Sequence, residues 1–134
     1  MTKQGASKPV KNSKQKILIV EDEQLLNDAY KIVLEKEGYR AISAFEGKEA
    51  LELADKHKPD LILLDLRMPV MSGLEFLENF KVTERTHKPK ILVFSNMDIQ
   101  TDIDQAYALG ATKYILKAWA SPKELIRIVH DLLK

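Results

Sequence analysis

Short apolar runs alternate with longer segments of helical period from Ile17 to the end of the chain. The short runs are four to six residues long and consist mostly of apolar, β-branched and aromatic residues, which predicts strands. They are ILIV (17–20), YRAISA (39–44), LILLD (61–65), KILVFS (90–95) and KYIL (113–116). Five segments of helical period lie between and after them.

Each helical segment carries apolar residues three or four positions apart, which predicts one buried face per helix. The five stripes are Leu25, Leu26, Ala29, Ile32 and Val33; Ala50, Leu51 and Ala54; Leu74, Leu77 and Phe80; Ile99, Ile103, Ala106 and Leu109; and Leu125, Ile128, Val129 and Leu132. Gly38 and Gly110 follow the first and fourth helices, where a left-handed residue commonly ends a helix. Ser121 and Glu124, with Pro122 between them, predict a capping box at the start of the last helix.

This alternation predicts an α/β fold: a doubly wound, five-stranded parallel sheet with helices on both faces. Ligands of such sheets bind outside the carboxyl ends of the strands. Acids, a hydroxyl and a lysine follow or end four of the predicted strands: Glu21, Asp22 and Glu23; Asp65; Ser95; and Lys117.

Taken singly, each of these residues is explained by capping of the next turn or by an exposed charge. Taken together they point to a metal site, because two carboxylates about 4 Å apart repel by roughly 4 kcal/mol at an effective dielectric constant of 20. Mg²⁺ fits best, since it takes carboxylate and phosphate oxygens. Lys117 and Ser95 then supply a charge and a donor to an anion beside the metal, so the site suits a phosphoryl group.

The composition fits a single domain of 134 residues with 45% apolar residues. Residues 1–15 predict a disordered basic tail, because their charges are all lysines and apolar residues are sparse. We interpret this tail as a solubilising segment; contact with nucleic acid or a membrane surface by charge is the alternative. The chain has no cysteine, and its sequence shows neither a signal peptide nor a membrane span, which predicts a cytoplasmic protein.

The motifs ILIVEDE (17–23) and DLRMPVMSG (65–73), with Ser95 and Lys117 at later strand ends, resemble the receiver domain of two-component response regulators. The resemblance covers residues 16–134. It implies a flavodoxin-like fold with strand order 2-1-3-4-5 and five helices. It also implies that Asp65 accepts a phosphoryl group from a phosphohistidine on a sensor histidine kinase or a histidine phosphotransfer protein.

The resemblance assigns the other site residues as well. It implies that Mg²⁺ is bound by Asp22, by Glu21 directly or through water, by Asp65 and by the backbone carbonyl of Arg67. Ser95 would hydrogen-bond the phosphoryl group and Lys117 would pair with another of its oxygens. Ser95 and Tyr114 would form the switch, which shifts the surface of the fourth helix, fifth strand and fifth helix toward a downstream partner.

Five positions bear on how far the family pattern carries over. The family usually has proline after the lysine, whereas Ala118 stands here, so the preceding bond is either trans in a rebuilt loop or cis at a cost of about 2.5–4 kcal/mol. We interpret Trp119 as a packing residue; an exposed anchor for a partner is the alternative. Asn96 is larger than the usual residue and would narrow access to the phosphoryl group. Arg67 and Met97 would shield it from water.

Three other functions are alternatives to a phospho-accepting receiver. A metal-dependent phosphatase of the type with Asp-x-Asp after the first strand does not fit, because the acceptor candidate here follows the third. A flavin or nucleotide module would need backbone donors where Glu21, Asp22 and Glu23 stand. A receiver-like scaffold that binds partners without phosphorylation remains the main alternative.

We expect no enzyme in the ordinary sense, but an acceptor that assists its own phosphorylation and dephosphorylation. Because only one helix follows Lys117, we also expect no DNA-binding domain, in a stand-alone regulator or an excised receiver.

Overall fold

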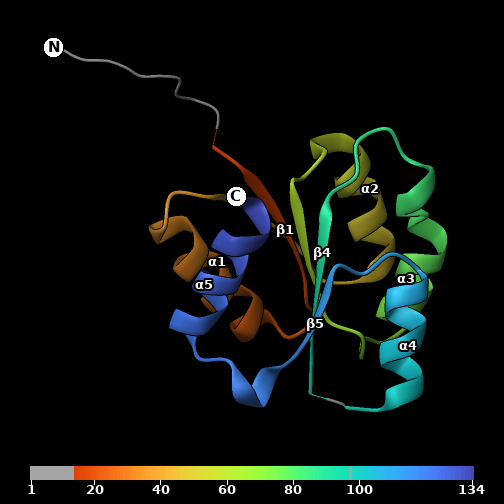
Figure 1. Ribbon diagram of the computed structural model, residues 1–134. Helices are drawn as coiled ribbons and strands as arrows, with labels where there is room; N and C mark the ends of the chain where they lie inside the picture. Colours follow the sequence, from red (N-terminus) through yellow and green to blue (C-terminus); the bar gives the residue numbers. More distant parts are fainter. Residues whose placement is uncertain (1–13, 97) are drawn as a thin grey trace, which may run out of the picture.

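The computed structural model describes residues 14–96 and 98–134. Five parallel strands form one sheet in the order β2-β1-β3-β4-β5 (Figure 1). The strands are β1 (Lys16–Val20), β2 (Arg40–Ala44), β3 (Leu61–Leu64), β4 (Lys90–Ser95) and β5 (Lys113–Leu116). The predicted strands and their order are therefore confirmed.

Helices cover both faces of the sheet. One face carries α1 (Gln24–Lys36) and α5 (Pro122–Leu133), and the other carries α2 (Gly47–His57), α3 (Gly73–Phe80) and α4 (Gln100–Ala108) (Figure 1). Two short 3-10 helices, η1 (Val82–Glu84) and η2 (Lys117–Trp119), lie after α3 and β5. The sheet is buried between these two layers, as expected for parallel strands with helical crossovers.

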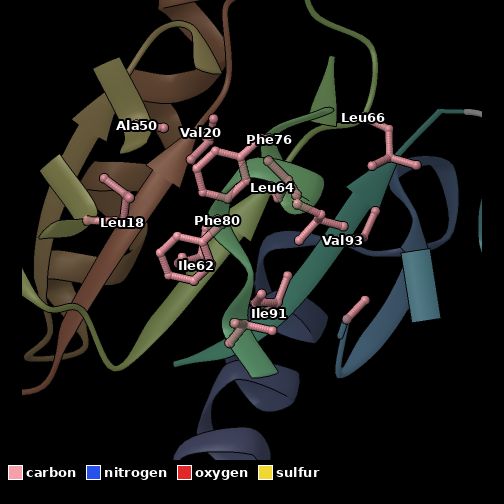
Figure 2. Packing of buried hydrophobic residues seen from close by; sticks show 14 of the residues in the cluster. Leu18, Val20, Ala50, Ile62, Leu64, Leu66, Phe76, Phe80, Ile91 and Val93 are labelled. Carbon is pink, nitrogen blue, oxygen red and sulfur yellow. The ribbon is translucent and has the colours of Figure 1, made fainter. Parts of the chain in front are cut away.

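Alternate residues of the central strands feed two hydrophobic clusters. In β1, Leu18 and Val20 face α2 and α3, whereas Ile17 and Ile19 face α1 and α5. Figure 2 shows the first cluster, in which the stacked rings of Phe76 and Phe80 lie among strand side chains. Close packing on both faces makes the central strands rigid supports for the residues that follow them.

The buried face of α1 differs from the predicted stripe. Leu25 and Ile32 are 85% and 59% exposed, whereas Asn27 and Leu34 are fully buried. Tyr30 lies between them in sequence, and its ring stacks on Phe94 with centroids 5.5 Å apart. The prediction was wrong here because a polar residue and a tyrosine occupy the inward positions. The pattern of apolar residues therefore indicates the wrong face of α1 as the buried one.

The two predicted glycine helix ends are confirmed, whereas only the Ser121 half of the predicted capping box is formed. Gly38 and Gly110 have φ values of 95° and 108°, the left-handed conformation that glycine adopts without steric cost. At the start of α5, Ser121 Oγ accepts a hydrogen bond from Glu124 N at 3.2 Å. The Glu124 carboxylate itself pairs with Arg127.

Residues 1–13 of the predicted tail lie outside the described residues, so its disorder stays a prediction. Gln15, its last residue, contacts the domain: its carbonyl oxygen accepts from Arg40 N at 2.9 Å, and its amide donates to Leu133 O at 3.1 Å. Among the helices that the structure describes, none combines the length and apolar character needed to cross a bilayer.

Candidate functional site at the carboxyl ends of the strands

Three acidic side chains from two neighbouring strands meet at one edge of the sheet. Glu21 and Asp22 directly follow β1, and Asp65 directly follows β3, which pairs with β1 in the sheet. Each offers a carboxylate oxygen, and these oxygens lie within 4.8 Å of one another. Glu21 and Asp65 are almost fully buried, at 2% and 7% exposure. The sequence prediction that these acids share one site agrees with this geometry.

Lys117 brings the positive charge to this cluster from β5, at the edge of the sheet. Its Nζ lies 2.7 Å from Glu21 Oε1 and 3.5 Å from Asp65 Oδ2. The lysine side chain is only 10% exposed, so the ion pairs are little screened by water. One ammonium group therefore faces two buried carboxylates, with Asp22 as a third acid beside them.

Backbone amides orient the two buried acids. Glu23 N donates to Glu21 Oε2 at 3.1 Å, and Arg67 N donates to Asp65 Oδ1 at 3.2 Å. Each acid thus uses one oxygen for a backbone donor two residues away and turns the other toward Lys117. The chain directly after each strand holds the carboxylate, and this fixes its direction without help from solvent.

Burial raises the pKa of Asp65 above its usual value, and the neighbouring Asp22 charge raises it further, while Lys117 and the amide of Arg67 oppose the shift. Burial also raises the pKa of Glu21, against the hydrogen bond from Lys117. Desolvation is the largest cause in both cases. Ionised acids are therefore costly at this edge unless further positive charge arrives.

The donor set fits Mg²⁺. Three carboxylates offer hard oxygen ligands within reach of one centre, and their charge exceeds that of the single lysine. The predicted fourth ligand is the carbonyl of Arg67, whose amide already lies at the site. That assignment stays a prediction.

The side chain of Arg67 makes a contact that the sequence did not suggest. Its Nη2 lies 2.8 Å from Asp102 Oδ2 on α4, although the arginine is 54% exposed. The loop after β3 is thus linked to α4 by an ion pair. The predicted shielding by Met97 falls on a residue outside the described part of the chain.

Ser95 and Tyr114, the two predicted switch residues, come from the neighbouring strands β4 and β5. Ser95 is fully buried, whereas Tyr114 is half-buried and packs against the cluster that contains α3 and α4. Burial raises the pKa of Tyr114, and a hydrogen bond with the Ser95 side chain opposes this shift. The backbone N–H of Tyr114 donates to the hydroxyl of Tyr107 on α4 at 3.0 Å. Tyr114 is therefore linked both to Ser95 on β4 and to Tyr107 on α4.

The loop after Lys117 is rebuilt around a trans peptide bond. No peptide bond in the described residues is cis, and residues 117–119 form η2. Trp119 is 79% exposed, so the packing interpretation of this residue was wrong. Between this loop and α1 lies a cavity of about 410 Å³, and Asn96 lines it beside Lys117.

Two residues near the site were not given a role by the sequence analysis. Asn27 is buried on α1, and only its i, i+3, i+7 spacing with Tyr30 and Leu34 hints at this. Gly73, the last residue of a motif, begins α3; a Cβ there would lie 2.5 Å from Asp65 O and 2.7 Å from Leu66 Cα. Glycine is required because α3 approaches the backbone of the central acid so closely.

A doubly wound parallel sheet with clustered acids and a lysine at its carboxyl edge defines a class of α/β signalling domains. The family model described as "Response regulator receiver domain" matches residues 17–130, and the chain belongs to this family. The match runs from the second residue of β1 to His130 in α5.

Individual relatives agree with this assignment. The chain is 35% identical over 104 residues to sporulation initiation phosphotransferase F of Bacillus subtilis, covering 77% of this chain and 82% of that protein. It is 33% identical over 107 residues to the polar-differentiation response regulator DivK of Brucella ovis, covering 80% and 87%. The chemotaxis protein CheY4 of Vibrio cholerae superimposes with a TM-score of 0.82 at 28% identity, covering 90% of this chain and all of that one.

Other relatives are longer proteins. The chain spans about half the length of several curated relatives that it matches, including 48% of the alkaline phosphatase synthesis transcriptional regulatory protein PhoP of Bacillus subtilis and 53% of the nitrate/nitrite response regulator protein NarL of Escherichia coli.

Proposed function

We propose that the chain is a phospho-accepting receiver in which Asp65 takes a phosphoryl group from a phosphohistidine. The donor is a sensor histidine kinase or a histidine phosphotransfer protein of the same cytoplasmic signalling system. The observation that carries the proposal is the meeting of Glu21, Asp22 and Asp65 around Lys117 at the end of a buried strand.

The reaction forms one bond and breaks one. A carboxylate oxygen of Asp65 attacks phosphorus, the P–N bond to the donor imidazole breaks, and its electron pair leaves with the ring nitrogen, which takes a proton. Asp65 is suited to this role because the Arg67 amide and the rigid strand β3 hold it in place. Such a transfer asks for positioning and charge neutralisation more than for acid–base catalysis.

Lys117 is placed to neutralise the arriving group. Its ammonium lies 3.5 Å from Asp65 Oδ2, within reach of a phosphoryl oxygen attached to that residue. The Ser95 hydroxyl donates to another phosphoryl oxygen. Glu21, Asp22, Asp65 and the Arg67 carbonyl would hold Mg²⁺, which supplies neutralisation of the charge on the transferred oxygens.

Phosphorylation changes the conformation of the surface made by α4, β5 and α5, and a downstream protein binds this surface. Ser95 moves toward the phosphoryl group, its bond with Tyr114 is exchanged, and the tyrosine repacks toward the sheet. This shifts the population between two packings of α4. The bond between Tyr114 N and Tyr107 supports a coupling of β5 to α4, and Trp119 offers an exposed anchor on the same face for a downstream protein.

The test is direct phosphorylation by a small donor. The protein is incubated with Mg²⁺ and acetyl phosphate or phosphoramidate, and its intact mass is measured. We expect the addition of one phosphoryl group, absent in Asp65→Asn and in samples treated with a chelator. Asp131→Asn, on the exposed side of α5, is the matched control and should be phosphorylated normally. An unmodified wild-type mass would favour a scaffold that binds partners without phosphorylation. Full modification of Asp65→Asn would refute Asp65 as the acceptor.

A further inference from the structure

Asn27 is a fully buried polar residue on the inward face of α1. Its side-chain Nδ2 donates two hydrogen bonds of 3.0 Å, to the backbone carbonyls of Glu21 and Ala44. These carbonyls lie just past the end of β1 and at the end of β2. One amide therefore ties together a helix and two strands at the edge where the acids stand.

A third hydrogen bond completes this junction of Asn27, Glu21 and Ala44. Glu21 N donates to Ala44 O at 3.1 Å, so the same carbonyl accepts from Glu21 and from Asn27. The peptide group between Glu21 and Asp22 is held through the Glu21 oxygen. Because Glu21 and Asp22 flank this peptide group, the direction of their side chains depends on the junction.

Stability of the fold does not by itself explain an asparagine at position 27. Its Oδ1 is buried and has no hydrogen-bond partner among the described residues. A buried acceptor left in this way lowers stability, and an apolar residue of the same shape would avoid that loss. What such a residue would not supply is a double donor to the two carbonyls.

We propose that Asn27 is a positioning residue for the metal site, which fixes the Glu21–Asp22 peptide group so that the carboxylates converge with Asp65. This inference rests on the proposed function of the acid cluster. Residues that orient metal ligands typically contribute 10- to 100-fold to metal affinity. We therefore expect Asn27→Ala to weaken Mg²⁺ binding about tenfold.

The experiment measures Mg²⁺ affinity by calorimetry and stability by urea unfolding, on the full chain. The variants are Asn27→Ala and Asn27→Ser; serine is too short to reach both carbonyls. Leu34→Val is the matched control, because Leu34 is fully buried on the same helix, at the end remote from the acids. The rate of phosphorylation by acetyl phosphate is measured at low and at saturating Mg²⁺.

The positioning role predicts a higher dissociation constant for Mg²⁺ in the folded Asn27 variants and an unchanged one in Leu34→Val. It also predicts that saturating Mg²⁺ largely restores their phosphorylation rate. Folded variants that bind Mg²⁺ as the wild type does would overturn the inference, as would equal weakening in Leu34→Val. Wild-type protein that binds no Mg²⁺ would instead refute the proposed function, so the two failures are distinguishable.

Discussion

Charged side chains at the two ends of the sheet differ in their burial and in their pairing. At the amino ends of the strands, Lys16 N donates to Asp60 Oδ2 at 2.8 Å, and Arg85 pairs with Asp55 at 2.8 Å with both side chains partly exposed. At the carboxyl ends, Glu21 and Asp65 are buried with one shared lysine. At the amino ends the ion pair of Arg85 with Asp55 is partly exposed to solvent. At the carboxyl ends, three carboxylates face a single lysine, and two of them are buried.

This difference shows that the arrangement of charges at the carboxyl ends of the strands lowers the stability of the fold. Charges at the amino end serve local structure and contribute little, because exposed ion pairs are weak. The carboxyl end keeps carboxylates close together that repel and are desolvated. This cost to folding is the reason why we propose that a cation and a phosphoryl group bind there.

The largest effect is expected from Lys117→Met. Without the ammonium, the metal-free protein buries two carboxylates with no counter-ion, and removal of one partner of a buried pair typically costs about 3–5 kcal/mol. Loss of one charge-stabilising donor should also slow phosphorylation by acetyl phosphate about 100-fold. Urea unfolding and intact mass measure the two effects. At the amino end, Asp55→Asn is the control and should cost less than about 1 kcal/mol; equal losses at both ends would contradict the comparison.

Gly73→Ala comes next. The added methyl would lie 2.5 Å from the carbonyl oxygen of Asp65, so the start of α3 or the acid must move. We expect a loss of roughly 1–3 kcal/mol in the free energy of unfolding, together with slower phosphorylation. Gly38→Ala is the matched control: its φ of 95° imposes strain, but a Cβ there meets nothing within 4 Å. A Gly38 variant that lowers phosphorylation as much would refute the steric explanation.

A smaller effect concerns pH. The native pKa values of Asp65 and Glu21 lie above their usual values, so the native state binds more protons than the unfolded state as pH rises through this range. The free energy of unfolding of the metal-free protein should therefore fall as pH rises above about 4–5 through the native pKa values. Asp65→Asn should flatten this slope and raise stability at pH 7 by about 1 kcal/mol. Unfolding curves with and without Mg²⁺ test this, since Mg²⁺ should stabilise the wild type more than the variant; an unchanged slope would contradict it.

The smallest effect is expected at Val70. This residue is 97% exposed in the loop after β3 and has a φ of 68°, which is strained for a β-branched side chain. Val70→Gly should raise the free energy of unfolding by a few tenths to about 1 kcal/mol, since relief of strain exceeds the added entropy of the unfolded chain. At the amino end, Lys58→Gly at the end of α2, with a φ of 49°, offers the same test. Thermal unfolding that shows a loss at Val70 would argue that the loop depends on this side chain.

Most of the fold followed from the sequence because the strands are buried on both faces and their apolar runs are short and sharply bounded. Glu21, Asp65 and Lys117 were found because parallel strands bring their carboxyl ends to one edge. The inward face of α1 was not predictable from apolar residues, because Asn27 and Tyr30 occupy it and Leu25 and Ile32 point outward.

The details of the site were beyond pattern analysis for a different reason. Neither the ion pair of Arg67 with Asp102 nor the hydrogen bonds of Asn27 follows from spacing, because each joins residues on separate elements through side-chain geometry. The exposure of Trp119 depended on whether its loop was rebuilt, and the residue type at 118 left both outcomes open.

The position of Trp119 has a practical consequence. It is the single tryptophan of the chain, it is largely exposed, and it ends the 3-10 turn that begins at Lys117. Its fluorescence therefore reports on this turn alone, without any attached dye, and a change in emission on addition of Mg²⁺ would show that the turn responds to the acid edge.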